Sequence, residues 1–155
     1  MSKLGFSKRD NASRCKNSAI YSLAMREHSR HELKNKLLKK EYVDGVDLER
    51  LLDELEASDY LSDKRFAESF IRYRVSRGQG KIKIIAELKQ RGVNTSLINT
   101  SIQESGVDWF ALAKQIRERK FGEIVPLEYK QKSKQMRFLL GRGFDSEMIR
   151  YAVAY

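Results

Sequence analysis

IIAELKQRGVNTSLINTSI, residues 84–102, has the same pattern as QMRFLLGRGFDSEMIRYAV, residues 135–153. The offset between the two stretches is constant at 51 residues, the interval from Gly92 to Gly143. In each copy an apolar helical stripe leads into Arg-Gly and one apolar residue, and Asn94 or Asp145 then stands where a second helix would need its N-cap. A period near fifty residues is typical of arrays of small helical units. The sequence therefore predicts a repeat protein rather than one enzyme-like domain.

The composition favours helix and a negatively charged partner. The 155 residues include one proline, and Leu, Lys, Glu, Arg and Ala, which are good helix formers, are abundant. There are 31 Lys and Arg against 21 Asp and Glu, a net charge of +10. Such a surplus is typical of proteins that bind nucleic acid, an acidic protein surface or an anionic membrane face.

Cysteine content and hydropathy predict a cytoplasmic protein without membrane-spanning segments. No run of 18 apolar residues occurs, and the first twenty residues lack the apolar stretch of a signal peptide. Cys15 is the only cysteine, so no internal disulfide is possible and a reducing compartment is expected.

The predicted organisation is an all-α array of three tandem three-helix repeats. We expect a flexible basic N-terminal tail over 1–13 and repeats over 14–61, 62–107 and 108–155. In the first repeat a helix is predicted over 18–27, and Ser29 and Glu32 have capping-box spacing at the start of the next. Asp47 is the expected cap of the third helix.

The later repeats have similar start and stop signals. Gly92 is expected to end one helix in the left-handed conformation, and Asn94 to cap the next. In the last repeat Asp108 caps a helix that carries Trp109 and Phe110 in the core and stops at Phe121-Gly122. A long basic helix is predicted from Pro126 to about Arg142, followed by a helix capped by Asp145.

No arrangement of residues predicts catalysis, a metal site or a cofactor. His28 and His31 stand in a polar stretch without a third committed ligand and are expected to be exposed. Cys15 has no second thiol, and the acidic pairs fall at helix starts, where they stabilise the helix dipole. The string RGQGK at 77–81 lacks the spacing of a phosphate-binding loop. The protein is therefore predicted not to be an enzyme.

The basic residues are the candidate site. Seven positive residues and one acid, Glu87, lie between Arg72 and Arg91, and five positive residues and no acid lie between Lys130 and Arg142. A merely solvated helix face normally mixes both signs. The predicted partner- or nucleic-acid-binding residues are Arg72, Arg74, Arg77, Lys81, Lys83, Lys89, Arg91, Lys130, Lys134 and Arg137.

A base-reading helix-turn-helix around Gly92 is not favoured. The helix after the turn, NTSLINTSIQES at 94–105, has no Arg or Lys with which to contact phosphate or guanine. The positive charge precedes the turn, which suits contacts with a nucleic-acid backbone or with protein.

The ordered motifs resemble the RecX family of recombinase regulators over about residues 14–155. The matching strings are AMREHS at 24–29 with Glu32-Leu33, YLSDKRFA at 60–67, Gly80-Lys81 with Ile84, Leu88 and Gly92-Val93, Asp108-Trp109, Lys120-Phe121-Gly122, and RFLL-x-RGF at 137–144. Each string alone is weak, and the ordered set is specific.

The resemblance implies a curved, elongated helical array with a basic face and no enzymatic activity. It implies a regulator that binds the RecA recombinase filament on single-stranded DNA and inhibits its ATPase, strand-exchange and coprotease activities, in DNA repair, recombination and the SOS response. The expected partners are the filament and single-stranded DNA within or near it, and the expected state is a monomer. The alternative is a general nucleic-acid-binding helical module without a recombinase partner.

Overall fold

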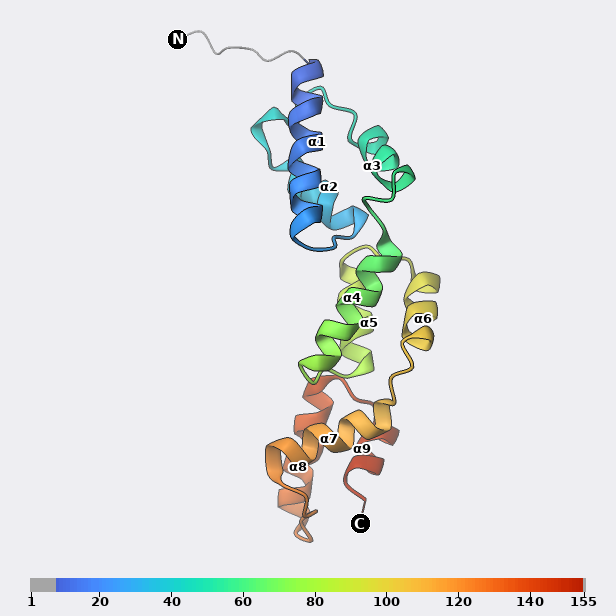
Figure 1. Cartoon of the computed structure of the whole chain (residues 1–155). Helices are drawn as coiled ribbons and strands as arrows, with labels where there is room; N and C mark the ends of the chain where they lie inside the picture. Colours follow the sequence, from blue (N-terminus) through green and yellow to red (C-terminus); the bar gives the residue numbers. More distant parts are fainter. Residues whose placement is uncertain (1–7, 155) are drawn as a thin grey trace. The chain divides into compact units, whose positions relative to one another are not determined.

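The structure, a computed structural model, describes residues 8–154, which form helices and no strand (Figure 1). The predicted all-α fold is confirmed. The helices are α1 (Lys8–Met25), α2 (Arg30–Leu38), the short 3-10 helix η1 (Glu41–Val43), α3 (Leu48–Ala57), α4 (Asp63–Ser76), α5 (Lys81–Gln90), α6 (Thr95–Glu104), α7 (Trp109–Phe121), α8 (Tyr129–Arg142) and α9 (Ser146–Ala152).

The helices belong to two compact units. Unit 1 extends to Ala67 and includes the separate segment Arg91–Val93, and unit 2 contains residues 68–90 and the chain from Asn94 onward. The predicted second repeat, 62–107, is thus shared between them, and the predicted repeat boundaries stay a prediction.

Unit 1 is built around a leucine core under α1. Cys15 and Ala19 of α1 are completely buried among residues of α2, α3 and the chain after it: Leu33, Leu37, Leu48, Leu51, Leu52, Leu55 and Leu61. Burial raises the pKa of the Cys15 thiol, against a smaller opposite effect of Arg14. The thiol is therefore held in its neutral, unreactive form.

The N-terminal prediction was wrong in part, because helix α1 already begins at Lys8. Residues 8–13, predicted as tail, are helical, and residues 1–7 of that predicted tail lie outside the described residues. The segment has no apolar stripe of its own. Packing of Cys15 and Ala19 and the stacking of Arg14 over the Tyr42 ring, 4.2 Å away, anchor the helix further along. Extending an anchored helix costs much less than nucleating one.

His28 corrects the expectation that both histidines are exposed. It is 3% exposed, and its Nδ1 lies 3.0 Å from the carbonyl oxygen of Arg26, whereas His31 is exposed. Burial lowers the pKa of His28, and the hydrogen bond to Arg26 opposes this only partly. His28 is thus a neutral structural residue of the connection from α1 to α2.

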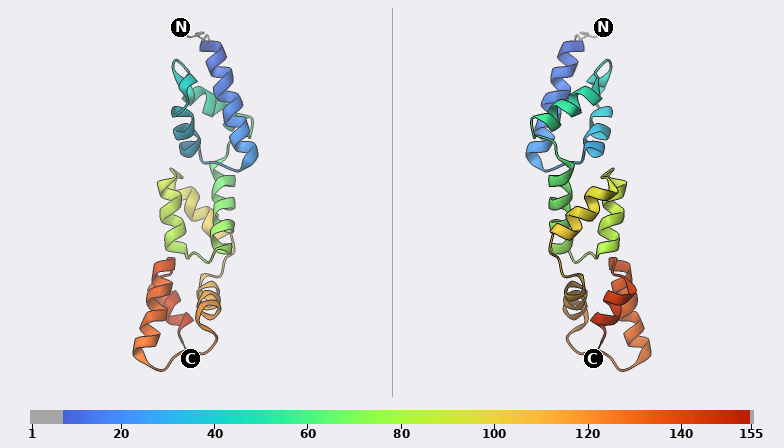
Figure 2. Two further views of the ribbon diagram at one scale, coloured as in Figure 1. Left: turned by 90° about the vertical axis from the view of Figure 1, so that its left-hand side faces the viewer. Right: turned by 90° about the vertical axis from the view of Figure 1, so that its right-hand side faces the viewer.

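In unit 2, α7, α8 and α9 contact one another (Figures 1 and 2). Trp109 is buried there as predicted, but Phe110 is 39% exposed, and its ring meets Tyr151 edge-on at 5.7 Å. The two are neighbours on one helix, and only Trp109 is on the side that faces the core. The Phe110 prediction was wrong.

Helix α8 begins at Tyr129 with Glu128 as its N-cap, three residues after the predicted start at Pro126. A proline is well suited to a first helical turn. However, Ile124 and Leu127 around it are almost fully exposed, so burial of these two side chains does not stabilise a turn there.

Candidate polyanion-binding surface

In unit 2 the Arg-Gly turn that ends α8 lies against the first residues of α5. The amide of Gly80 donates to the carbonyl of Arg142 at 2.7 Å, and the amide of Ile82 donates to the carbonyl of Gly143 at 3.0 Å. The first amides and last carbonyls of a helix have no partners within that helix. Here the unpaired carbonyls of α8 satisfy the unpaired amides of α5.

The equivalent Arg-Gly turn, Arg91-Gly92, makes a similar contact in unit 1. Ser29, the N-cap of α2, donates its hydroxyl to the carbonyl of Arg91 at 2.7 Å. The Arg91 guanidinium also forms an ion pair with Glu32, whose carboxylate accepts two further bonds from Arg26. Arg91 is therefore paired with an acid within unit 1, and its place in the predicted binding site stays a prediction.

The two contacts differ in one charge. At the offset of 51 residues Arg142 corresponds to Arg91, and Lys83 corresponds to Glu32. In unit 1 this position holds the acid that pairs with Arg91, whereas in α5 it holds a positively charged lysine. The Arg142 guanidinium instead lies over the Phe138 ring, 5.3 Å from its centroid, and donates to the carbonyl of Arg77 at 3.5 Å.

Glu32→Ala is expected to destabilise the protein by about 2 kcal/mol, because it removes a largely buried carboxylate that accepts several hydrogen bonds. Burial raises the pKa of Glu32, but hydrogen bonds from Arg26 and Ser29 and the Arg91 charge lower it overall. Its stabilisation is thus present above the unfolded-state pKa near 4.5 and is lost as the pH falls through the lower folded-state value.

Denaturant unfolding from pH 7 to pH 3 measures this effect. The wild type should lose more stability below pH 4.5 than Glu32→Gln does. Lys83→Ala is the matched control at the equivalent position and should change stability by less than about 0.5 kcal/mol. Equal pH dependence in the wild type and in Glu32→Gln would contradict the assignment.

Four arginines line a hollow of about 510 Å3 in unit 2. We call Arg74 of α4, Arg77 directly after α4, Arg119 of α7 and Arg142 of α8 the arginine cluster. Arg74 pairs with Glu87 at 3.1 Å. For Arg77, Arg119 and Arg142, no carboxylate of the described residues lies within ion-pairing distance. The hollow also contains Tyr73, Ser76 and Gln79.

The structure brings only part of the predicted site together. Arg74 and Arg77 share the cluster, whereas Arg91 belongs to unit 1. Six further predicted residues lie on α5 and α8. Lys81 is half-buried, and the other five are exposed: Lys83, Lys89, Lys130, Lys134 and Arg137. These residues stay a prediction.

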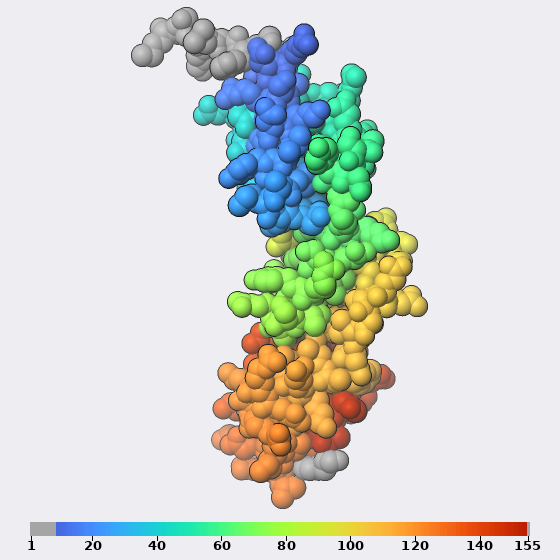
Figure 3. Space-filling view, in the orientation of Figure 1, coloured from blue at the N-terminus to red at the C-terminus, as the bar shows by residue number. Residues whose placement is uncertain are grey.

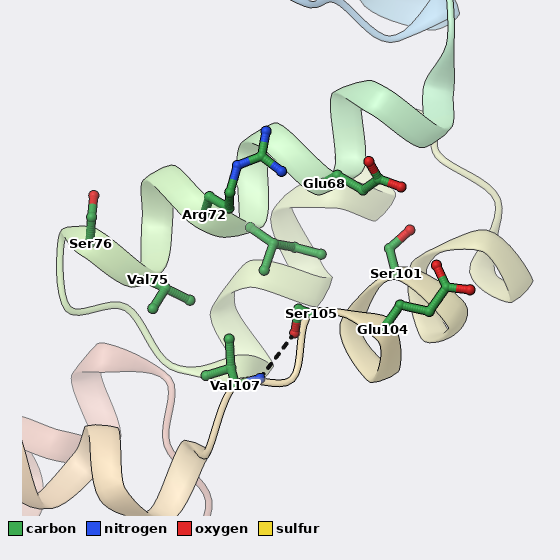
Figure 4. Close-up of a pocket in the computed structure, with 9 residues that line it drawn as sticks. Glu68, Arg72, Val75, Ser76, Ser101, Glu104, Ser105 and Val107 are labelled. Atoms are coloured by element: carbon green, nitrogen blue, oxygen red, sulfur yellow. Dashed lines mark hydrogen bonds between the residues drawn. The ribbon is translucent and has the colours of Figure 1, made fainter.

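Arg72 lines a different hollow, of about 530 Å3, between α4 and the end of α6 (Figure 4). Glu68 of α4 and Glu104 of α6 are in its wall, and Ser105 accepts a bond from the Val107 amide at 3.4 Å. Two carboxylates against one guanidinium make this hollow unsuitable for a polyanion.

Sequence reasoning missed Arg119 and did not select Arg142. Arg119 lies between Glu118 and Lys120 near the end of α7, and nothing in the sequence places it near α4. Arg142 was detectable, because it matches Arg91 in the repeat while Lys83 replaces the acid. The replacement affects the surroundings of Arg142 only because α5 and α8 are in contact.

Arg117, two residues from Arg119, is part of the fold rather than of the surface. Its guanidinium is completely buried and donates to the carbonyls of Ala152, Gly122 and Glu123 and to the side chain of Gln135. It thereby joins α7, the loop after α7, α8 and the end of α9.

Within residues 8–154 there is no group of three His, Cys, Asp or Glu side chains with the geometry of a metal site. None of the helices described is both long and apolar enough to cross a bilayer.

Sequence profiles of three RecX domains match this chain in order. The first three-helix domain matches residues 15–46, the second residues 62–102 and the third residues 107–153. The chain belongs to the RecX family. The predicted family and the three tandem three-helix domains are confirmed.

Proteins named Regulatory protein RecX are similar over most of their length. That of Halorhodospira halophila is 40% identical over 139 residues, covering 90% of this chain and 86% of its own. That of Vibrio vulnificus is 39% identical over 140 residues, covering 90% and 91%. Family membership therefore identifies this chain as a RecX-type regulatory protein.

Two solved RecX structures share the fold. The crystal structure of RecX from Lactobacillus salivarius superimposes with a TM-score of 0.77 over 94% of this chain and 96% of that one. A second RecX crystal structure superimposes with a TM-score of 0.76, over 94% of this chain and 73% of that one. Both are 19% identical in sequence, so this likeness concerns the fold alone.

Proposed function

We propose that this RecX protein binds the RecA recombinase filament on single-stranded DNA and inhibits its ATPase, strand-exchange and coprotease activities. The observation that carries the proposal is family membership along nearly the whole chain. The protein acts as a cytoplasmic, non-enzymatic monomer that controls recombination and repair. By binding one conformation of the filament more tightly than another, the protein shifts the equilibrium toward that conformation. A ligand without catalytic groups inhibits an enzyme in this way.

An exposed apolar loop supports a protein partner over nucleic acid alone. In the loop between α7 and α8, Ile124 and Leu127 are 85% and 87% exposed, and Tyr129, the first residue of α8, is 84% exposed. The space-filling view shows the surface of α7 and the loop after it, in orange, on the face turned to the viewer (Figure 3). Aliphatic side chains gain nothing from phosphate but gain free energy when a protein surface covers them. An apolar surface of a filament subunit is the kind of partner that would cover this loop.

The test is the ATPase activity of a RecA recombinase on single-stranded DNA in excess, with substoichiometric amounts of this protein. Filament binding predicts inhibition under these conditions, whereas a general nucleic-acid-binding module would inhibit only when DNA is limiting. The double variant Ile124→Ser/Leu127→Ser should need roughly ten times more protein for equal inhibition, the effect of losing one interfacial anchor.

The matched control replaces two exposed apolar side chains of unit 1, in Met25→Ser/Leu38→Ser. It should inhibit like the wild type, and all variants should keep their helical content by circular dichroism. Inhibition that is the same in both double variants would remove the loop from the interface. No inhibition by the wild type with DNA in excess would overturn the proposed function.

A further inference from the structure

We infer that the arginine cluster is a binding site for the phosphates of a single nucleic-acid strand, with Tyr73 stacking on a base beside it. The inference extends the proposed function, because it assigns the DNA-facing part of the surface to one site. It needs no recombinase to be tested.

The first argument is the shape and charge of the site. Guanidinium groups from α4, α7 and α8 converge on one polar hollow, so an anion that enters it can contact several of them at once. Planar guanidinium groups donate pairs of hydrogen bonds to phosphate oxygens. Arg77 and Arg119 are exposed and have no acidic partner among the described residues, so neither must break an ion pair to bind a ligand.

The second argument is that the structure maintains the positive charge of the site. Arg142 is fixed by its contact with the Arg77 carbonyl and by the bonds between the Arg142-Gly143 turn and α5. Where unit 1 has Glu32 to neutralise the equivalent arginine, unit 2 has Lys83. Like charges held close together without an acid destabilise a fold unless an anion is bound. The presence of these positive charges beside a preformed hollow therefore favours the binding of an anionic ligand.

The third argument selects a nucleic-acid strand rather than an acidic protein face. Tyr73 lines the same hollow, its side chain is 57% exposed, and the Arg77 guanidinium carbon lies 5.9 Å from its ring centroid. An exposed aromatic ring beside cations is the arrangement that binds single strands, because phosphates meet the charges while a base stacks on the ring. An acidic peptide would use the cations and leave the ring uncovered.

Fluorescence anisotropy of a labelled oligo(dT) strand, measured without recombinase, tests the site. Arg77→Ala/Arg119→Ala should weaken binding about tenfold to a hundredfold and lower the slope of log affinity against log salt by about two. The control Lys114→Ala/Arg150→Ala removes the same charge from exposed positions of α7 and α9 and should weaken binding no more than about twofold.

Variants of Tyr73 distinguish the binding of a nucleic-acid strand from the binding of other anions. Tyr73→Ala should weaken oligo(dT) binding about tenfold, and Tyr73→Phe, which keeps the ring, should restore it. Inorganic polyphosphate carries the charge without bases, so it should compete for the site but respond only to the arginine variants.

Two results would overturn the inference. One is equal weakening by the cluster and control double variants, which would mean that only net charge matters. The other is displacement of the strand by poly-glutamate as effectively as by unlabelled oligo(dT) at equal charge, together with no effect of Tyr73→Ala. Recombinase inhibition by the wild type is measured separately, so failure of this site and failure of the proposed function are distinguishable.

Discussion

Arg117→Ala should lower the free energy of unfolding by about 4 kcal/mol, because four acceptor groups, two of them in buried hydrogen bonds, lose a charged donor and a cavity forms. The side chain is 1% exposed, so water cannot replace it without rearrangement of unit 2. Since domains are stable by only about 5–15 kcal/mol, this is a large share of the total. The melting temperature should fall by roughly 10 °C or more.

The control is Arg119→Ala, two residues further along α7. Arg119 is exposed, so its removal should change stability by less than about 0.5 kcal/mol. Chemical denaturation followed by circular dichroism measures both variants. A similar loss in the two would mean that α7 responds to charge rather than to the buried hydrogen bonds of Arg117. The comparison also shows whether Arg119 can be replaced in binding studies without damage to the fold.

The second large effect is expected for Gly143→Ala, at the contact between α8 and α5. Gly143 has φ +98°, where a side chain is strained, and a methyl group there would lie 2.5 Å from Cβ and 2.8 Å from the amide nitrogen of Lys83. The α5 backbone must move to relieve the overlap, and the bonds donated by Gly80 and Ile82 would then lengthen or break. We expect a loss of about 3 kcal/mol.

Gly106→Ala is the matched control, because Gly106 also has positive φ, +66°, but a methyl group there meets nothing within 4 Å. The Gly106→Ala variant should lose about 1 kcal/mol of stability, from backbone strain alone. Thermal unfolding of the two variants separates backbone strain from close packing. If both lose the same amount, the α5–α8 contact is looser than described. Gly143→Ala should also weaken oligo(dT) binding, because the turn positions Arg142.

The helix boundaries that were predictable depend on neighbouring residues alone. Ser29 and Glu32 form the capping box as expected, and Asp47, Asn94, Asp108 and Asp145 each accept a bond from an amide two or three residues later. Such caps need no distant partner, so spacing is enough to find them. The helix starts that were predicted wrongly have other causes: α1 extends back to Lys8 from residues anchored by distant contacts, and α8 begins at Tyr129, after two exposed apolar residues.

The candidate site was less predictable than the fold. A surplus of basic residues is visible in the sequence, but their number does not show which of them are neutralised. Arg74 lies opposite Glu87 and Arg72 shares a hollow with two glutamates, whereas Arg119 looked unremarkable and joins the cluster. These differences arise because the fold brings residues of α4, α5, α6, α7 and α8 together.

Arg91-Gly92 and Arg142-Gly143 illustrate the division most directly. Their local sequence alone determines that each pair stands at the end of a helix with an apolar stripe, that the glycine adopts positive φ and that a capped helix comes next. It is the same information in both copies, so it cannot distinguish them. The folded chain places Arg91 against Glu32 and the turn of Arg142 against Lys83. Because a charge is neutralised only by a group within a few ångströms, contacts between residues distant in the sequence pair Arg91 with an acid, whereas Arg142 has no carboxylate of the described residues within ion-pairing distance.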